Sequence, residues 1–169
     1  MSKAFVKDDD TDAPEFVAPR APLPPGVVNY VTAEGLRALE AELEALRAER
    51  ASLDGSEPAT DARGALQQLA IRRRELEQRI ESAVLVVPEA DANGRVRFGA
   101  DVTVQSGDGR ERCYRIVGVD EADAARGKIA FTAPLSRALL GRQQGEFVSV
   151  RTPRGDEELE ILSVTYAAG

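Results

Sequence analysis

Apolar side chains recur at steps of three and four residues over the stretch Ala33–Ala83. This spacing keeps one stripe of an α-helix facing one partner, so the stretch predicts two amphipathic helices. Arg50 and Arg73 each fill the one missing position in their half of the pattern. The predicted seam positions are Leu36, Leu39, Leu43, Leu46, Arg50, Leu53, Leu66, Leu69, Arg73, Leu76, Ile80 and Ala83.

The two halves of the seam match each other when the chain is folded back on itself. Leu36 then faces Ala83, and the two residue numbers of every facing pair add up to 119. A constant sum is what two antiparallel helices in register require, so we predict one intramolecular coiled-coil hairpin with its tip near Asp54–Asp61. Two helices packed on separate cores are the alternative, and they would not need the constant sum.

Capping and helix-breaking residues set the expected helix ends. Thr32 is a good N-cap for the first helix. We expect this helix to end at Leu53, because Gly55 and Pro58 break the pattern. The second helix should restart between Pro58 and Gly64.

Beyond Val84 the apolar pattern changes to the alternation that is typical of β-strands. Turn signals rich in Gly, Pro and Asp separate five such segments, and only Leu135–Leu140 has a helical pattern. The prediction is a small, twisted antiparallel β domain of about 75 residues with one short helix against it. The expected strands are Val96–Val104, Cys113–Val119, Lys128–Phe131, Glu146–Val150 and Leu159–Val164.

These patterns give an α+β fold class and divide the chain into four parts. Residues 1–29 hold five of the nine prolines and an acidic run without apolar periodicity, so we expect a disordered or extended tail. Residues 30–87 form the predicted hairpin, residues 88–95 a hinge-like linker, and residues 96–169 the β domain. The proline-rich run in the tail favours a stiff spacer over a polyproline ligand.

Charge and composition exclude several classes of function. The net charge of -7 argues against nonspecific binding to nucleic-acid phosphates, which needs a surplus of Lys and Arg. We expect no direct sequence-specific DNA binding either. No run approaches 18 apolar residues and the N-terminus lacks the apolar core of a signal peptide, so we expect a cytoplasmic protein with no membrane partner. We also expect the protein to be a monomer.

Histidine is absent, and Cys113 is the single cysteine. The absence of histidine removes Ser-His and Cys-His nucleophiles, imidazole bases and most zinc sites. Cys113 stands in the strand-like run RCYRIV, which favours a buried structural thiol over a nucleophile. No histidine-dependent catalytic site is therefore expected, and the sequence indicates no site for a stably bound metal or cofactor.

Several runs of the C-terminal half form a recognisable set: VRFGADVTV from Val96, YRIVGVDEAD from Tyr114, GKIAFTAPLSRALLG from Gly127 and the ending from Gly145. In this order they resemble the bacterial Gre transcription elongation factors, GreA and GreB. They look like the FKBP-like domain of that family, although Ala133 stands where the family has a serine. The run NYVTAEGLRALEAELEAL likewise resembles the start of the family's coiled coil.

The resemblance implies a mechanism that depends on a partner. Gre factors dock their β domain on the rim of the RNA polymerase secondary channel and insert the coiled coil into that channel. Two acidic residues at the tip then help to hold a second Mg²⁺ at the polymerase active centre and activate water for cleavage of backtracked RNA. The resemblance thus implies core RNA polymerase as the partner, a Mg²⁺ shared with it, and no active site in the factor itself.

The tip both keeps and departs from the family pattern. Asp54 and Glu57 keep the D-x-x-E spacing, but Pro58 stands where the family has Asn and Asp61 where it has an aromatic residue. The first helix is also about two heptads shorter than the family's, and about fourteen missing residues pull the tip back by roughly 20 Å. Catalysis tolerates misplacement of only about 1 Å. We therefore favour a simple polar turn at this acidic pair over a magnesium-delivery site.

The resemblance also implies a docking surface, made by the acidic turn and by the start of the short helix. Without the resemblance, these residues would indicate a solvated turn and an ordinary helix start. The predicted docking residues are Asp120, Glu121, Asp123, Ala133, Pro134 and Leu135.

The predicted function is a Gre-type regulator that competes with full-length cleavage factors or partly occludes the channel. One alternative is a regulator of the nucleoside diphosphate kinase type, which combines a short coiled coil with the same β domain. Another is a peptidyl-prolyl isomerase, which needs an aromatic pocket, whereas most aromatic residues of the domain stand at expected core positions. These residues are Phe98, Tyr114, Phe131, Phe147 and Tyr166.

Overall fold

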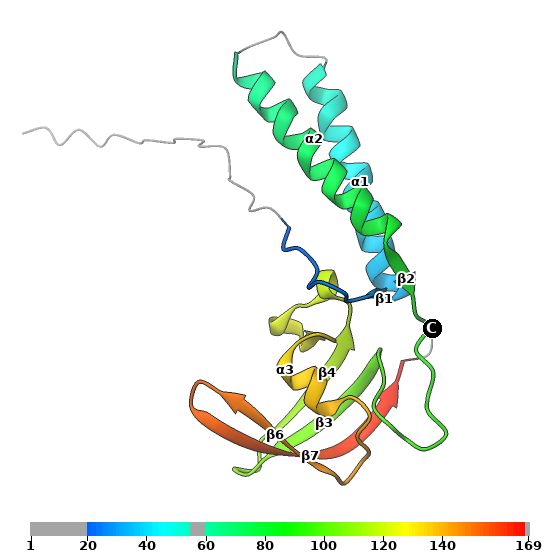
Figure 1. The fold of residues 1–169 in the computed structure, drawn as a ribbon, viewed down its shortest axis with the longest axis vertical. Coiled ribbons are helices and arrows are strands. Elements are labelled where there is room, and N and C mark those ends of the chain that lie inside the picture. Colours follow the sequence, from blue (N-terminus) through cyan, green and yellow to red (C-terminus); the bar gives the residue numbers. More distant parts are fainter. Residues whose placement is uncertain (1–19, 55–59, 168–169) are drawn as a thin grey trace, which may run out of the picture.

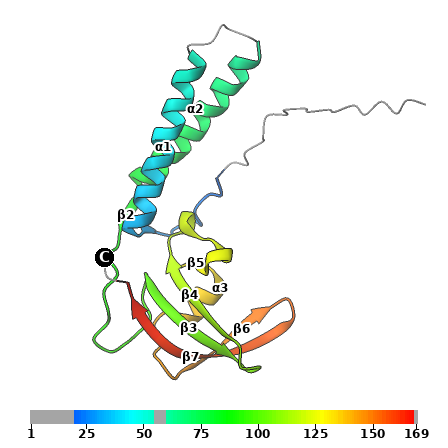
Figure 2. The ribbon, with the colours of Figure 1, turned by 180° about the vertical axis from the view of Figure 1, so that it is seen from behind.

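The computed structural model describes residues 20–54 and 60–167, which form two modules (Figure 1). A pair of long helices projects from one end of a curled β-sheet, and the segment that begins at Arg20 runs along their junction. Figure 2 shows the same arrangement from behind. We call residues 29–85 the hairpin module, residues 96–167 the β module, and residues 20–28 the strap.

The helices of the hairpin module are equal in length. Helix α1 spans Ala33–Asp54 and helix α2 spans Thr60–Glu81, 22 residues each. At 1.5 Å per residue, each is about 33 Å long. Thr32 is the N-cap of α1 as predicted, because its Oγ1 accepts a hydrogen bond from the Gly35 N–H at 3.0 Å. The end of α1 and the start of α2 also agree with the predicted positions to within the usual uncertainty of helix ends.

The predicted apolar stripe is where α1 and α2 meet. Arg50 and Arg73 do not pair across this contact: each binds a carboxylate one turn further along its own helix, Asp54 at 3.6 Å and Glu77 at 3.4 Å. The facing pairs proposed from the constant sum stay a prediction. The buried positions of the stripe are Leu39, Leu46, Leu69 and Leu76, and the partly buried ones packed against them are Leu36, Leu43, Leu53, Ile80 and Ala83.

Two short strands close the base of the hairpin module, and they correct two predictions. Strand β1 (Asn29–Val31) pairs in parallel with β2 (Ala83–Leu85), so Ala83 lies beyond the end of α2 and not within it. Asn29, assigned to the tail, is buried, and its Nδ2 donates a hydrogen bond to the Arg79 carbonyl at 2.9 Å. A parallel pairing between segments about fifty residues apart leaves no local signal in the sequence.

Five strands form one sheet within residues 96–167, in the order β5-β4-β3-β7-β6. Neighbouring strands are antiparallel, except that β5 runs parallel to β4. The bounds are β3 (Ala100–Ser106), β4 (Glu111–Val117), β5 (Lys128–Ala130), β6 (Phe147–Thr152) and β7 (Gly155–Tyr166). The turns η1 (Val119–Glu121) and η2 (Ala124–Arg126) precede β5, and helix α3 (Pro134–Leu139) follows it.

Alternate residues of the strands build the core of the β module. Val102, Ile116 and Ile161 are fully buried in the sheet, and Leu139 of α3 joins the same cluster. The first strand of the β module, β3, begins at Ala100, whereas the prediction began at Val96. Gly99, just before it, has a φ of 83°, a left-handed conformation that interrupts an extended strand.

Cys113 is exposed, which corrects the prediction of a buried thiol. Successive side chains of a strand point to opposite faces, and Ile116 of β4 points into the core. Arg115 binds Asp101 of β3 through two hydrogen bonds of 2.8 and 2.9 Å. Phe147 is also exposed, at 58%, although its strand position suggested the core.

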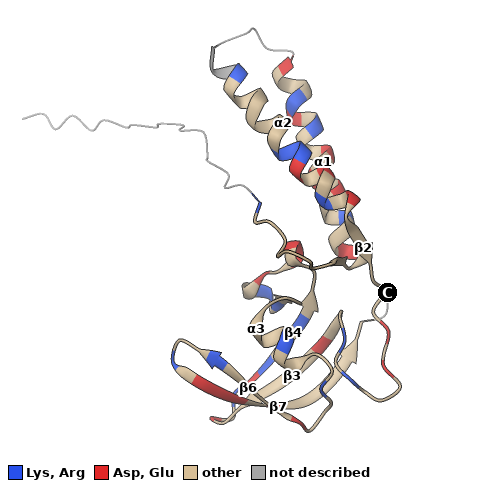
Figure 3. Cartoon of the chain, viewed as in Figure 1, with Lys and Arg blue, Asp and Glu red and all other residues tan. Residues whose placement is uncertain are grey.

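Charged residues of both signs are spread along both helices (Figure 3), and most of them are exposed. Such a surface is typical of helices that face water. No helix in residues 20–54 or 60–167 combines the length and the apolar character needed to cross a membrane.

Candidate functional site

The tip of the hairpin module is only partly described. Asp54 is the last residue of α1 and is exposed, with its Oδ2 3.6 Å from the Arg50 Nε. Glu57, the other member of the predicted acidic pair, lies outside the described residues. Among the residues that the structure does describe, no group of three His, Cys, Asp or Glu side chains could hold a metal. The acidic tip therefore stays a prediction.

Glu121 of η1 connects the two modules by capping α1. Its carboxylate accepts hydrogen bonds from the Thr32 N–H at 3.1 Å, from the Thr32 hydroxyl, and from the Gly118 N–H at 3.0 Å. In a capping box, a Glu three residues into the helix accepts the N-cap N–H. Here that helical position is Gly35, and the carboxylate comes from the β module instead.

The absence of a side chain at Gly35 makes this arrangement possible. A Cβ added there would lie 2.1 Å from the Glu121 Cδ and 2.4 Å from its Cγ. The glycine thus leaves the space that Glu121 occupies. The signal in the sequence was a capping Thr followed three residues later by Gly, where Glu or Gln would complete the box.

Asp120, the neighbour of Glu121, lies at the centre of a buried charge cluster. Its side chain is only 6% exposed. The Arg20 Nη1 donates a hydrogen bond to its Oδ1 at 2.5 Å, and the Arg79 Nε lies 3.2 Å from its Oδ2. Arg20 also donates to Glu42 of α1 at 2.5 Å. We call Arg20, Glu42, Arg79 and Asp120 the junction cluster.

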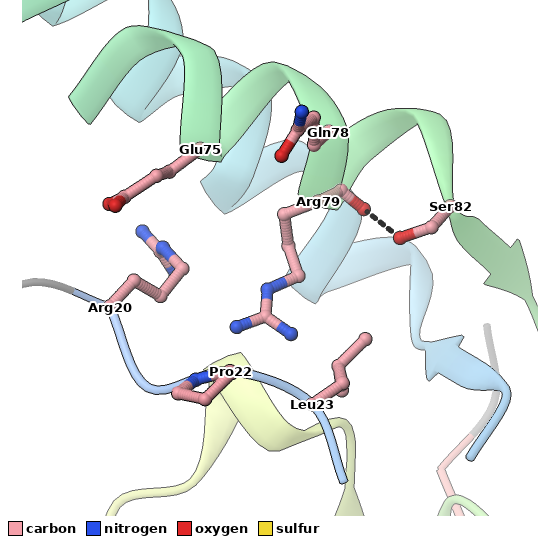
Figure 4. Close-up of a pocket in the computed structure, with 7 residues that line it drawn as sticks. All are labelled: Arg20, Pro22, Leu23, Glu75, Gln78, Arg79 and Ser82. Atoms are coloured by element: carbon pink, nitrogen blue, oxygen red, sulfur yellow. Dashed lines mark hydrogen bonds between the residues drawn. The ribbon is translucent and has the colours of Figure 1, made fainter. Parts of the chain in front are cut away.

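Arg79 also holds the strap itself. Its side chain is 7% exposed, and its Nη2 donates a hydrogen bond to the carbonyl of Ala21. In Figure 4 the Arg79 guanidinium points from α2 toward Pro22 and Leu23 of the strap. These residues, with Arg20, line a cavity of about 270 Å³.

A further ion pair joins the modules at the surface. The Lys128 Nζ donates to the Glu34 Oε1 at 2.8 Å. This hydrogen bond, with the charge of Lys128, lowers the pKa of Glu34 below its usual value. No pattern in the sequence indicated that this pair, or Arg20 and Arg79, would join the two modules.

Of the predicted docking residues, Asp120 and Glu121 face the hairpin module, and Asp123 is the third residue of the acidic turn. Asp123 is the N-cap of η2, where its Oδ1 accepts from the Ala125 N–H at 3.1 Å. Its carboxylate also lies 3.5 Å from the Arg126 Nε, and its side chain is 42% exposed. It therefore keeps oxygen atoms open to a partner.

The other predicted docking residues stand at the start of α3. Ala133 is the N-cap, Pro134 is the first helical residue and is exposed, and Leu135 packs partly against the core. The main chain of Asp123 pairs with Lys128 at one end of β5, and the Ala133 N–H bonds to the Ala130 carbonyl at the other end. Strand β5 therefore links the two parts of the predicted surface.

The structure thus defines a class of protein in which a helical hairpin projects from a β module and is tied to it by buried polar contacts. The family model described as "Transcription elongation factor, GreA/GreB, C-term" matches residues 91–166. The transcription elongation factor GreB of Neisseria meningitidis serogroup A is 40% identical over 153 positions, which cover 82% of this chain and 94% of that protein. The chain therefore belongs to the GreA/GreB family of transcription elongation factors.

Other relatives match over similar lengths. The transcription elongation factor GreA of Hyphomonas neptunium is 35% identical over 151 positions, covering 80% of this chain and 96% of that protein. A solved GreA/GreB structure from Nitrosomonas europaea is 25% identical and overlays 81% of this chain and 98% of its own, with a TM-score of 0.42.

The alignment with the Neisseria protein also shows a difference in length. It has 153 positions but covers 82% of the 169 residues of this chain, so about fourteen of its positions have no residue here. These positions, taken together, amount to about two heptads.

Proposed function

We propose that this protein binds core RNA polymerase at the rim of the secondary channel and occupies the channel entrance without efficient stimulation of transcript cleavage. It would then compete with full-length cleavage factors for the same place. Membership of the GreA/GreB family supports the choice of partner. The observation that carries the rest is the length of the hairpin, 22 residues in each helix, together with the fourteen-position gap against a GreB relative.

Asp123 and Pro134 are the residues we propose for polymerase docking. Both are accessible, whereas Asp120 and Glu121 are engaged with the hairpin module. An exposed carboxylate before β5 and an exposed proline after it offer a partner one charge and one rigid apolar contact. In this proposal, Asp120 and Glu121 support docking only indirectly, by placing η2 and β5.

The tip geometry supports weak cleavage. If the fourteen absent positions fall in the hairpin, about seven per helix would shorten it by roughly 10 Å, and all of them in α1 by roughly 20 Å. Either distance far exceeds the roughly 1 Å within which catalytic groups must be placed. Asp54, moreover, has Arg50 as a neighbouring countercharge. We therefore propose that Asp54 and Glu57 supply no ligand to the Mg²⁺ of the polymerase.

A cleavage assay tests this function. A backtracked elongation complex is incubated with Mg²⁺ and the protein, with and without a full-length Gre factor. We expect little cleavage by the protein alone and a reduced rate when it competes with the full-length factor. Strong cleavage that is lost in Asp54→Ala or Glu57→Ala would show that the length argument is wrong.

A binding assay tests the docking surface separately. We expect Asp123→Ala with Pro134→Ala to reduce retention on immobilised core polymerase by about tenfold or more. Asp108→Ala is the matched control, because Asp108 is an exposed carboxylate in the turn between β3 and β4. Failure of the unchanged protein to bind core polymerase at moderate salt would refute the proposed partner.

A further inference from the structure

The strap is bound to three separate elements. The guanidinium of Arg20 donates to Asp120 of η1 and to Glu42 of α1, both at 2.5 Å. Arg79 of α2 donates to the carbonyl of the next strap residue, Ala21. Residues before the hairpin module therefore bridge its two helices and the β module.

Three of the four charges of the junction cluster are largely buried, whereas the Glu42 side chain is 42% exposed, and the buried charges make the contacts selective for one geometry. The Asp120 and Arg79 side chains are 6% and 7% exposed, and Arg20 is 23% exposed. Burial by itself would lower the pKa of Arg20, but its hydrogen bonds to Glu42 and Asp120 outweigh burial and raise it. A buried charge that loses its partner is strongly destabilised, so the cluster favours the arrangement in which all its charges stay paired.

Two cavities lie next to Arg20 at the junction of the two modules. Arg20 lines a cavity of about 270 Å³ against α2 and a second one of about 210 Å³ between α1 and the β module. The second cavity is bordered by Gly35 and Leu39 of α1 and by Lys128 of β5. Apolar contact joins the modules at a different place, where the ring of Tyr30 in β1 lies 6.0 Å from that of Phe98 and 5.6 Å from that of Phe131. On the side of the strap, the contacts that join the modules are directional and polar.

We propose that Arg20 is a positioning residue, which fixes the direction of the hairpin by holding α1 and the β module in one relative orientation. The helices act as a lever: with a length of about 33 Å, a rotation of about 10° at the base moves the tip by roughly 6 Å. The consequence for polymerase rests on the proposed function, since the hairpin must enter the channel. The proposal that Arg20 fixes the direction of the hairpin does not depend on the proposed function.

A distance measurement between two spin labels tests the proposal in the full-length free protein. Cys113 is exposed and is the sole cysteine, so it carries the label of the β module. A second label at Ala51→Cys, an exposed position near the end of α1, reports on the hairpin. We expect one narrow distance distribution for the doubly labelled parent protein.

Arg20→Ala should at least double the width of this distribution or shift its mean by 5 Å or more. The urea midpoint should change little, because Asp120 keeps Arg79 as a partner and Glu42 is partly exposed to water. Arg20→Lys should restore part of the order, because an ammonium group keeps the charge but lacks the planar fork that serves two carboxylates. Arg154→Ala, at an exposed arginine between β6 and β7, is the matched control and should leave the distribution unchanged.

A distribution in Arg20→Ala that superimposes on that of the parent would overturn the proposal. If Arg20→Ala does not fold, Glu42→Ala serves instead, because it removes only the acceptor that links Arg20 to α1, and an unchanged distribution there is equally decisive. The measurement involves no polymerase, so it is independent of the proposed function. A changed distribution in a protein that does not bind polymerase would refute the proposed function and leave the role of Arg20 intact.

Discussion

Replacing Gly35 by Ala tests the shared cap between the modules. In most helices this change stabilises, by up to about 1 kcal/mol. Here the new methyl group would overlap the Glu121 side chain, with 2.1 Å to its Cδ, 2.4 Å to its Cγ and 2.4 Å to its Oε2. Glu121 cannot simply turn aside, because Thr32 and Gly118 hold its carboxylate with three hydrogen bonds.

The expected magnitude follows from these contacts. Loss of three hydrogen bonds at about 1 kcal/mol each costs about 3 kcal/mol. The gain in helix propensity returns up to about 1 kcal/mol, which leaves a net loss of about 2 kcal/mol. For a protein of this size, the melting temperature should fall by about 4–8 °C.

Thermal and urea unfolding followed by circular dichroism would measure this change. Gly64→Ala is the matched control, since Gly64 lies in α2 and an added Cβ would meet no atom within 4 Å. We expect this control to be as stable as the parent or more stable. In a Glu121→Ala background, Gly35→Ala should also become neutral or stabilising. A Gly35→Ala protein that gains stability as Gly64→Ala does would refute the shared cap.

Two further predictions concern single side chains. Cys113 should react with a thiol reagent in the native protein at nearly its rate in urea, and strong protection would contradict its exposure. Glu34→Gln should lower the unfolding free energy at pH 7 by less than about 1 kcal/mol, since the Glu34 side chain is 64% exposed although that of Lys128 is 18% exposed. Because that pair lowers the pKa of Glu34 below its usual 4.5, the difference from the parent should be complete above that pH and should shrink as the pH falls through the lowered pKa. A difference that does not shrink as Glu34 becomes protonated would contradict this origin.

Local periodicity was sufficient to predict the helices, and most of the strands approximately. The three-and-four spacing of leucines is specific for an α-helix, and α1 and α2 begin and end close to the predicted residues. Strand boundaries were less accurate because a single residue can end a strand, as Gly99 does before β3. Alternation alone also did not predict which face of β4 is buried, and the prediction for Cys113 was therefore wrong.

The junction could not be predicted, because its contacts join residues that are distant in sequence. Glu121 lies 89 positions from Thr32, and Asp120 lies 100 positions from Arg20. The acidic turn looked like one solvated unit from its composition. In the structure, Asp120 and Glu121 contact the strap and the hairpin module, whereas Asp123 caps η2. Sequence alone does not show which carboxylate of a turn faces another module.

The junction and the length of the hairpin have linked consequences for the proposed function. A flexible base would let a short hairpin sample many directions, and the entropy lost on entering a channel would then weaken binding. A base held by the Glu121 cap and by the junction cluster avoids much of that loss, because the hairpin is already oriented. The proposed function takes the tip to fall short of the active centre, and preorganisation of this kind would not restore that reach. Under this proposal, it favours occupation of the channel entrance over chemistry at the polymerase active centre, as expected of a competitor of cleavage factors.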